Sequence, residues 1–218
     1  MADQFSRTRL LVGDEPLARL AAAKVAVFGV GGVGGFCVEA LARAGVGTLH
    51  LYDDDTVSES NLNRQIVALH STIGQPKAEV MARRILDINP ACQVEVFRMF
   101  YLPENADQVD LSQYDYVVDC IDTVAAKLDL VERCTALQVP ILSAMGSGNK
   151  LDPTAFRVTD LSKTQGCPLA RVMRKELRKR GITHLKVVYS TEEPLTPLQP
   201  AEEEAPAGTD TRPRSTAR

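Results

Sequence analysis

The sequence predicts an α/β fold, in which helices cover both faces of a mostly parallel sheet. Short β-prone runs alternate with helical stretches from residue 24 to residue 144, which is typical of parallel strands joined by helical crossovers. The first run, KVAVFGV at 24–30, is almost continuously apolar, as expected of a strand buried on both faces. The 218 residues, 44 % apolar and 24 % charged, suffice for one sizeable domain with a small C-terminal extension.

Each element follows from a local pattern. Leucines at helical spacing, interrupted by Gly13 and Pro16, predict one or two short helices within 5–23. We expect strands at 24–30, 48–53, 93–100, 114–120 and 140–144. We expect helices at 34–44, 77–89 and 123–138. After Gly148 the pattern changes to a short strand at 155–159, a helix at 168–180 and a strand at 185–190. Residues 192–218 carry almost no large apolar side chain beyond Leu198, and we expect them to be disordered.

A glycine-rich turn follows the first strand and opens a helix. Glycine lets the backbone turn tightly and approach a polyphosphate, while the helix N-terminus offers free N–H groups to the anion. The next strand ends at Asp53, whose carboxylate can accept hydrogen bonds from ribose hydroxyls in a Rossmann-like fold. Alone, these features fit NAD as well as ATP. The glycines concerned are Gly29, Gly31, Gly32 and Gly34.

The next stretch favours ATP. A dehydrogenase would normally enter its second helix directly, whereas DDDTVSESNLNRQ at 53–65 is a polar loop. Lys77 then lies in the first turn of a helix, where the helix dipole disfavours a cation unless an anion is near. Together with Arg64 it would neutralise the outer phosphates of a triphosphate. The candidate nucleotide-binding residues of the loop are Asp55, Asn61, Arg64 and Gln65.

A fourth strand ends in Asp119-Cys-Ile-Asp122, which puts Asp122 at the mouth of the crevice as a candidate magnesium ligand. Arg64, Lys77 and Asp122 are therefore the candidate catalytic residues. A nicotinamide oxidoreductase or a non-catalytic nucleotide binder stays open at this point.

These motifs resemble the adenylating domain shared by ubiquitin-activating enzymes and their bacterial relatives in thiamine and molybdopterin synthesis, the ThiF/MoeB-like superfamily. The matching runs are GVGGVG at 29–34, the loop at 53–65, GQPKA at 74–78, INP at 88–90 and DCID at 119–122. The resemblance implies that a carboxylate attacks the α-phosphate of ATP, with Mg²⁺, to give an acyl-adenylate. It implies that Gly31 and Gly32 line the nucleotide, that Asp53 holds its ribose, that Asn61, Arg64 and Lys77 contact phosphates, and that Asp122 organises magnesium.

The same resemblance implies a homodimer in which Arg7 is lent to the partner's nucleotide. The second half lacks the paired CxxC motifs usual in thiamine and molybdopterin relatives, and looks like the bacterial tRNA threonylcarbamoyladenosine dehydratases. These are implied to activate the threonyl carboxylate of a modified adenosine beside the anticodon, which then cyclises onto its own carbamoyl unit with loss of water. An adenylating activator of a ubiquitin-like sulphur-carrier protein is the alternative. Members of the dehydratase family usually continue past such a tail with an apolar helical segment, so we expect either that the sequence is truncated or that the C-terminal part of the substrate pocket is incomplete.

From this resemblance we divide the chain into four parts. They are an N-terminal helical segment at 1–23, an ATP-binding Rossmann-like adenylation domain at 24–148, a substrate or crossover extension with a basic helix at 149–191, and a tail at 192–218. The expected partners are tRNA, a second copy of the chain and a desulfurase-type protein for sulphur transfer. No apolar run approaches the roughly 20 residues that span a bilayer, and the N-terminus lacks a secretion signal, so we expect a cytoplasmic location without a membrane.

The helix at 168–180 is strongly basic in a chain of net charge −3. Leu169, Val172, Met173 and Leu177 are expected to form its buried stripe, which leaves cations exposed to attract RNA phosphates. The candidate tRNA-binding residues are Arg171, Arg174, Lys175, Arg178 and Lys179. A solvated surface helix is the alternative.

Cys167 is the last candidate. It lies in a Gln-Gly-Cys-Pro turn, where we expect an accessible thiol that could accept the adenylate as a thioester. Cys37, Cys120 and Cys134 are instead expected to be small buried side chains.

Overall fold

Seven strands form one sheet in residues 3–198, the part of the chain that the computed structural model describes. The strand order is β3-β2-β1-β4-β5-β7-β6, and all neighbours are parallel except β7 and β6, which are antiparallel. The predicted α/β class with a mostly parallel sheet is therefore confirmed. The strands are β1 (Lys24–Phe28), β2 (Thr48–Tyr52), β3 (Gln93–Phe97), β4 (Tyr116–Asp119), β5 (Ile141–Ala144), β6 (Phe156–Asp160) and β7 (Lys186–Ser190).

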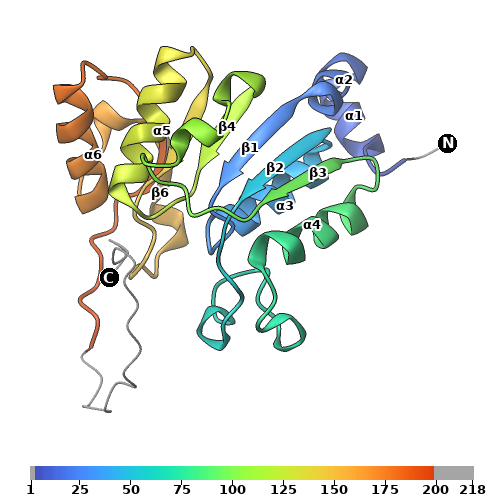
Figure 1. Cartoon of the computed structure of the whole chain (residues 1–218), viewed down its shortest axis with the longest axis horizontal. Coiled ribbons are helices and arrows are strands. Elements are labelled where there is room, and N and C mark those ends of the chain that lie inside the picture. Colours follow the sequence, from blue (N-terminus) through green and yellow to red (C-terminus); the bar gives the residue numbers. More distant parts are fainter. Residues whose placement is uncertain (1–2, 199–218) are drawn as a thin grey trace.

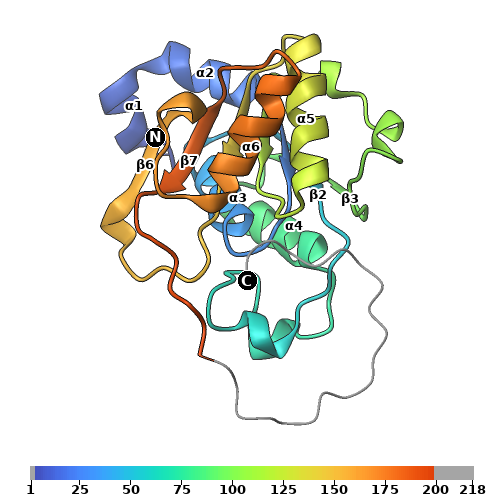
Figure 2. The same cartoon turned by 90° about the vertical axis from the view of Figure 1, so that its left-hand side faces the viewer.

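Helices cover both faces of this sheet (Figures 1 and 2). α3 packs beside α4 on one face, and α5 packs beside α6 on the other. None of the helices within residues 3–198 is both long and apolar enough to cross a bilayer. The helices are α1 (Ser6–Val12), α2 (Asp14–Ala22), α3 (Gly34–Ala44), α4 (Lys77–Ile88), α5 (Val124–Ala136) and α6 (Pro168–Lys179).

The first strand explains why two helical layers are needed. Side chains alternate across a strand, so Val25 and Val27 join the core formed with α3 and α4. Ala26 and Phe28 point the other way, into a core that contains residues of α5. All four side chains are buried. An apolar run without alternation therefore corresponds to a strand with helices on both faces.

The residues after Gly148 extend the same sheet. β7 pairs with β5 in parallel and β6 pairs with β7 antiparallel, so the 149–191 extension continues the layer begun by 24–148. Of the tail expected to be disordered, residues 192–195 are hydrogen-bonded to 149–152, which differs from the expectation. Residues 199–218 lie outside the described part of the chain.

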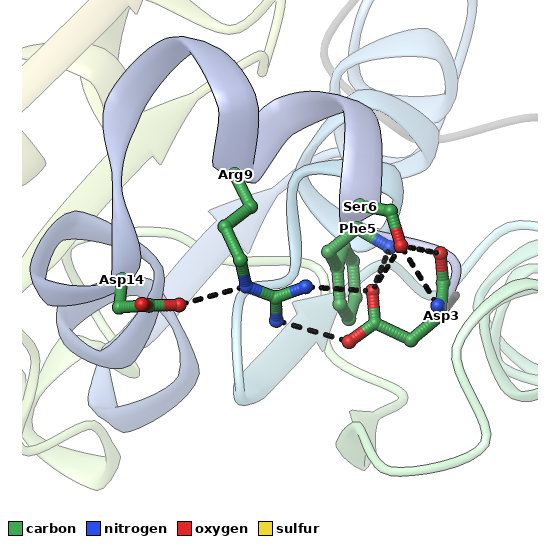
Figure 3. A network of polar contacts seen from close by, with 5 residues as sticks. All are labelled: Asp3, Phe5, Ser6, Arg9 and Asp14. Carbon is green, nitrogen blue, oxygen red and sulfur yellow. Dashed lines mark hydrogen bonds and ion pairs between the residues drawn. The ribbon is translucent and has the colours of Figure 1, made fainter. Parts of the chain in front are cut away.

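The N-terminal helix carries a network of surface ion pairs (Figure 3). The guanidinium of Arg9 reaches Asp3 at 2.9 Å and Asp14 at 2.7 Å. The hydrogen bond from Arg9 lowers the pKa of Asp3 to about 2. No residue of α1 is buried, and Leu10 and Leu11 are 86 % and 88 % exposed. The leucine side chains whose spacing predicts this helix therefore do not face the core of their own chain.

Candidate functional site

A large cleft lies at the carboxyl ends of the parallel strands, where ligands of open α/β sheets bind. Its volume is about 1280 Å³. Segments far apart in the sequence meet there: the turn after β1, the loop after β2, the start of α4 and the turn after β4. The predicted residues that line it are Gly29, Gly31, Gly32, Asp53, Asp55, Asn61, Arg64, Gln65, Lys77 and Asp122.

Two predicted residues, Gly34 and Arg7, do not line this cleft. Gly34 packs beneath the glycine turn, where a Cβ would lie 1.8 Å from the carbonyl oxygen of Gly29. Gly29 itself has a φ of +86°, and a Cβ there would meet the Cys120 carbonyl oxygen at 2.9 Å. Both glycines are required by the turn itself. Arg7 is exposed on α1 and lies outside the cleft lining.

Asp53 supports the glycine turn from below. One carboxylate oxygen accepts a hydrogen bond from the Val30 N–H at 2.6 Å, and the other accepts one from the Asp55 N–H at 2.9 Å. Burial raises the pKa of Asp53, and these two backbone bonds oppose that rise. The carboxylate thus links the end of β2 to the glycine turn that follows β1.

Lys77 reaches the cleft from the buried start of α4. The loop after β2 pairs with the residues before α4 through a bridge between Thr56 and Pro76. The Lys77 N–H donates to the Asp55 carbonyl at 3.0 Å, and Nζ pairs with the Asp55 carboxylate at 2.9 Å. Lys77 is only 5 % exposed, so its charge lies in a largely dry environment at the cleft wall.

The loop at 53–65 is ordered by its own polar side chains. The Asn61 side-chain oxygen accepts from the Ser58 N–H at 3.1 Å, which closes a short 3-10 helix at Glu59–Asn61. Arg64 is exposed, and its guanidinium donates to the Ser60 carbonyl at 2.8 Å. The arginine is therefore anchored to the loop at one nitrogen and open to the cleft elsewhere.

Gln65 carries an unsatisfied acceptor. The residue is 9 % exposed and lines the cleft beside Gly31. Its Oε1 is the buried side-chain atom without a hydrogen-bond partner among the described residues. A buried polar atom without a partner costs about 1–3 kcal/mol, which a ligand donor at this point would recover.

A buried ionic network lies behind Asp122. Asp119 accepts hydrogen bonds from Lys127 Nζ at 2.9 Å and from Ser143 Oγ at 2.5 Å, and all three side chains are fully buried. The other Asp119 oxygen accepts from the Ile121 N–H at 3.1 Å. The network therefore fixes the turn that carries Asp122. Sequence analysis missed Lys127 and Ser143, although a lysine on the apolar face of a helix is a signal for a buried partner.

The cleft has one feature of a magnesium site. Within residues 3–198, no three His, Cys, Asp or Glu side chains are grouped so that they could hold a metal ion by themselves. Mg²⁺ in nucleotide enzymes is commonly held by one or two carboxylates together with substrate phosphates. The exposed carboxylate of Asp122 in the cleft lining fits that mode.

The basic helix α6 differs in detail from the expectation. Its buried stripe consists of Ala170, Met173 and Leu177. Val172 is 43 % exposed, so the expectation that Val172 is buried is wrong. Arg174 lies at the edge of this stripe and donates to the Thr164 carbonyl at 2.8 Å.

The cations of α6 therefore fall into two groups. Lys179 and Arg180 pair with Glu176. Arg171, Lys175 and Arg178 are exposed and have no ion pair with the described residues. Five cations line a hollow of about 460 Å³, namely Arg171, Arg174, Lys175, Arg178 and Lys179.

The expectation of an accessible Cys167 thiol is wrong. Cys167 precedes Pro168 at the start of α6 and is 4 % exposed, packed in a core with Met145, Leu161 and Met173. Cys134 is buried as expected, whereas Cys37 and Cys120 are partly buried. Burial raises the pKa of Cys37 and of Cys120, and Cys120 also lines the cleft.

Comparisons with known proteins agree with one another. The sequence model of the ThiF family matches residues 5–191. A Bacillus subtilis tRNA threonylcarbamoyladenosine dehydratase is 48 % identical over 196 residues, which cover 89 % of this chain and 77 % of the relative. The Escherichia coli protein of the same name is 42 % identical over 197 residues, covering 87 % and 74 %. The structure of the E. coli tRNA N6-threonylcarbamoyladenosine dehydratase in complex with ATP superposes with a TM-score of 0.84 at 41 % identity, covering 89 % of this chain and 83 % of that one.

Proposed function

Since this chain belongs to the ThiF family, we propose that it uses ATP to dehydrate threonylcarbamoyladenosine in tRNA. One observation carries this assignment: the glycine turn, Asp53, Arg64, Lys77 and Asp122 line a single cleft at the carboxyl ends of the strands. The arrangement supplies the groups that a nucleoside triphosphate needs, in a chain whose sequence is 48 % identical to a dehydratase over 196 residues. The activity is therefore carboxylate adenylation followed by cyclisation.

Within the cleft each residue has a proposed role. Gly31 and Gly32 leave room for the triphosphate, and Asp53 accepts hydrogen bonds from the ribose. Arg64 and Lys77 neutralise the β- and γ-phosphates, with Asn61 beside them. Gln65 offers its unsatisfied oxygen to a donor of the bound substrate. Their shared position in one cleft supports these roles.

The chemistry follows from charge. An oxygen of the threonyl carboxylate attacks the α-phosphorus of ATP, and the bond from that phosphorus to the pyrophosphate oxygen breaks. Arg64 and Lys77 stabilise the charge that grows on the leaving pyrophosphate. A heteroatom of the carbamoyl unit then attacks the activated acyl carbon, loses its proton, and AMP leaves. The substrate has lost one water overall, and no protein acceptor takes part.

Asp122 is the proposed magnesium ligand. A magnesium ion bound there would add positive charge beside the phosphates of the substrate. The buried network of Asp119, Lys127 and Ser143 keeps the turn in place, so that Asp122 stays directed at the cleft. This role is supported by the exposed carboxylate in the cleft lining.

We also propose a homodimer. α1 has no buried residue in the single chain, and its exposed Leu10 and Leu11 offer an apolar surface to a second copy. Arg7 on the same helix then reaches the partner's nucleotide. A cytoplasmic location accords with a tRNA substrate. A desulfurase-type partner stays a prediction, because no step of the proposed reaction transfers sulphur.

One assay tests the function. The purified protein is incubated with ATP, Mg²⁺ and tRNA that carries threonylcarbamoyladenosine, and the nucleosides are analysed by mass spectrometry. We expect a nucleoside lighter by one water, with AMP and pyrophosphate formed in equal amounts. tRNA without the modification is the control and should leave ATP intact. Pyrophosphate release with a sulphur-carrier protein, and none with modified tRNA, would instead support the alternative activator.

A further inference from the structure

The cleft extends beyond the residues that are proposed above to bind ATP. Its 1280 Å³ exceed the roughly 300–1,000 Å³ of ordinary small-molecule sites. Beyond the glycine turn and the polar loop it is lined by a second set of segments, which none of the proposed ATP contacts uses. This second set, here called the far wall, comprises residues 146–151, Phe156, Leu169 and residues 195–198.

The far wall exposes large apolar side chains. Leu151 is 80 % exposed and Leu195 is 52 % exposed, although both line the cleft. Phe156, at the start of β6, is the aromatic side chain of the far wall and is 36 % exposed. Exposed apolar groups in a concave site indicate a ligand with an apolar face. A phosphate group does not match that chemistry, whereas a planar base does.

The far wall is held together by a reciprocal clasp between two segments. Lys150 Nζ donates to the Glu192 carbonyl at 2.7 Å and to the Ser190 carbonyl at 3.2 Å. In the opposite direction, the Glu192 carboxylate accepts from the Leu151 N–H at 2.9 Å and from the Asp152 N–H at 3.0 Å. Each residue thus uses its side chain to bind the other segment's backbone.

The clasp fixes the residues that follow it. The Leu195 N–H donates to the Asn149 carbonyl at 2.7 Å, so the chain from 192 to 195 runs along the loop at 149–152. Asn149 itself lines the cleft, and its backbone adopts a left-handed φ of 60°. Without the clasp, a segment with neither helix nor strand would have few bonds to hold Leu195 in place.

The helix that begins at the far wall carries exposed cations. Leu169 belongs to the far wall and lies in the first turn of α6. Further along the same helix, Arg171, Lys175 and Arg178 are exposed without an ion pair to the described residues. These cations are available on the same helix for phosphates of the strand that flanks a bound base.

We propose that the far wall is the subsite for the substrate adenosine, whose base contacts Phe156 and Leu195, and that Lys150 and Glu192 are positioning residues that hold this subsite. This inference rests on the proposed function, because the occupant is the modified base of an RNA strand. The base must lie beside the triphosphate for its carboxylate to reach the α-phosphorus, and the far wall is the part of the same cleft left for it.

The first test separates the two halves of the cleft. Glu192→Ala removes the carboxylate of the clasp, and Glu193→Ala, at the exposed neighbour without a hydrogen bond to the described residues, is the matched control. We expect Glu192→Ala to raise the KM for modified tRNA about tenfold, while the Kd for Mg-ATP in calorimetry stays within twofold of wild type. Unchanged ATP binding also shows that the variant is folded. Lys150→Met should act in the same direction.

A second pair of variants tests the base contact. Phe156→Leu keeps an apolar side chain but removes the ring, and should raise the KM for tRNA several-fold through lost stacking. Val158→Ala, on the same strand, 67 % exposed and outside the cleft lining, should not change it. Wild-type activity with an unchanged KM for tRNA in both Glu192→Ala and Phe156→Leu would overturn the subsite. A wild-type protein without activity on modified tRNA would overturn the proposed function instead.

Discussion

Lys77 is the residue on which the proposed phosphate binding most depends. It is 5 % exposed and is balanced by Asp55 alone among the ion pairs of the described residues. Lys77→Met keeps the length of the side chain and removes its charge. We expect ATP–pyrophosphate exchange with modified tRNA to fall about 10²–10³-fold, as for other lost groups that stabilise developing charge. Lys163→Met, at an exposed lysine outside the cleft, should exchange normally. Equal exchange in the two variants would contradict the role of Lys77.

A second residue matters for stability. Lys127→Met leaves the carboxylate of Asp119 buried without its cation, because both side chains are fully buried. We expect the free energy of unfolding to fall by about 3–5 kcal/mol, measured by urea denaturation. The double variant Lys127→Met with Asp119→Asn should be more stable than Lys127→Met alone, since no unpaired charge remains. A loss below about 1 kcal/mol in the single variant would show that the pair is not a determinant of the fold.

At the scale of elements, α6 carries the predicted contact with RNA. Lys175 and Arg178 are exposed and free of ion pairs to the described residues, so their charges are available to phosphates. The double reversal Lys175→Glu with Arg178→Glu should weaken tRNA binding at least tenfold at low salt. It should also make the slope of log K against log salt less negative by about one per lost phosphate contact. The matched control is Arg83→Glu with Lys186→Glu, which changes net charge equally at two exposed sites outside α6. An equal loss in the control would point to net charge alone.

Most elements could be predicted because their patterns are local. The apolar run of β1, the helix start at Lys77 and the alternation of strands and helices needed no tertiary information. The ends were less exact: the strand expected at 93–100 ends at Phe97, and the one expected at 24–30 ends at Phe28. Strand ends depend on pairing partners, and the pairing of β3 with β2 extends only as far as Phe97. Met173 and Leu177 of α6 are buried as expected, whereas Ala170 was not expected in the buried stripe because a small side chain marks it poorly.

The candidate site divides in the same way. The sequence predicted that these residues meet at one cleft, because its glycines, carboxylates and cations follow strand ends in a fixed order; their binding of a nucleotide stays a prediction. The far wall was not predicted, since it depends on pairs remote in sequence. Glu192 meets the backbone of residues 151 and 152, and Asp119 meets Lys127 and Ser143. Composition marked residues 192–198 as unable to build a core, which is true, but hydrogen bonds to a loop need no core.

At the scale of the whole molecule, the exposed face of α1 predicts self-association. Leu10→Glu with Leu11→Glu places two charges on side chains that are 86 % and 88 % exposed in the single chain. We expect the variant to sediment as a monomer at concentrations where the wild type is a dimer, because apolar interfaces do not tolerate unpaired charge. Leu86→Glu with Leu137→Glu, at positions 45 % and 49 % exposed outside α1, should leave the dimer intact. A monomeric wild type would contradict the proposal, including the role of Arg7.

The place of β7 in the sheet has a consequence for synthesis on the ribosome. β7 is the last strand in sequence among residues 3–198, yet it lies between β5 and β6. A nascent chain that has emerged only as far as β6 therefore exposes β5 as an unpaired edge, with free N–H and C=O groups that can recruit another chain. Only when residues 186–190 arrive does this gap close, and the Glu192 segment follows directly behind. Nucleotide affinity should thus appear before RNA affinity as translation proceeds.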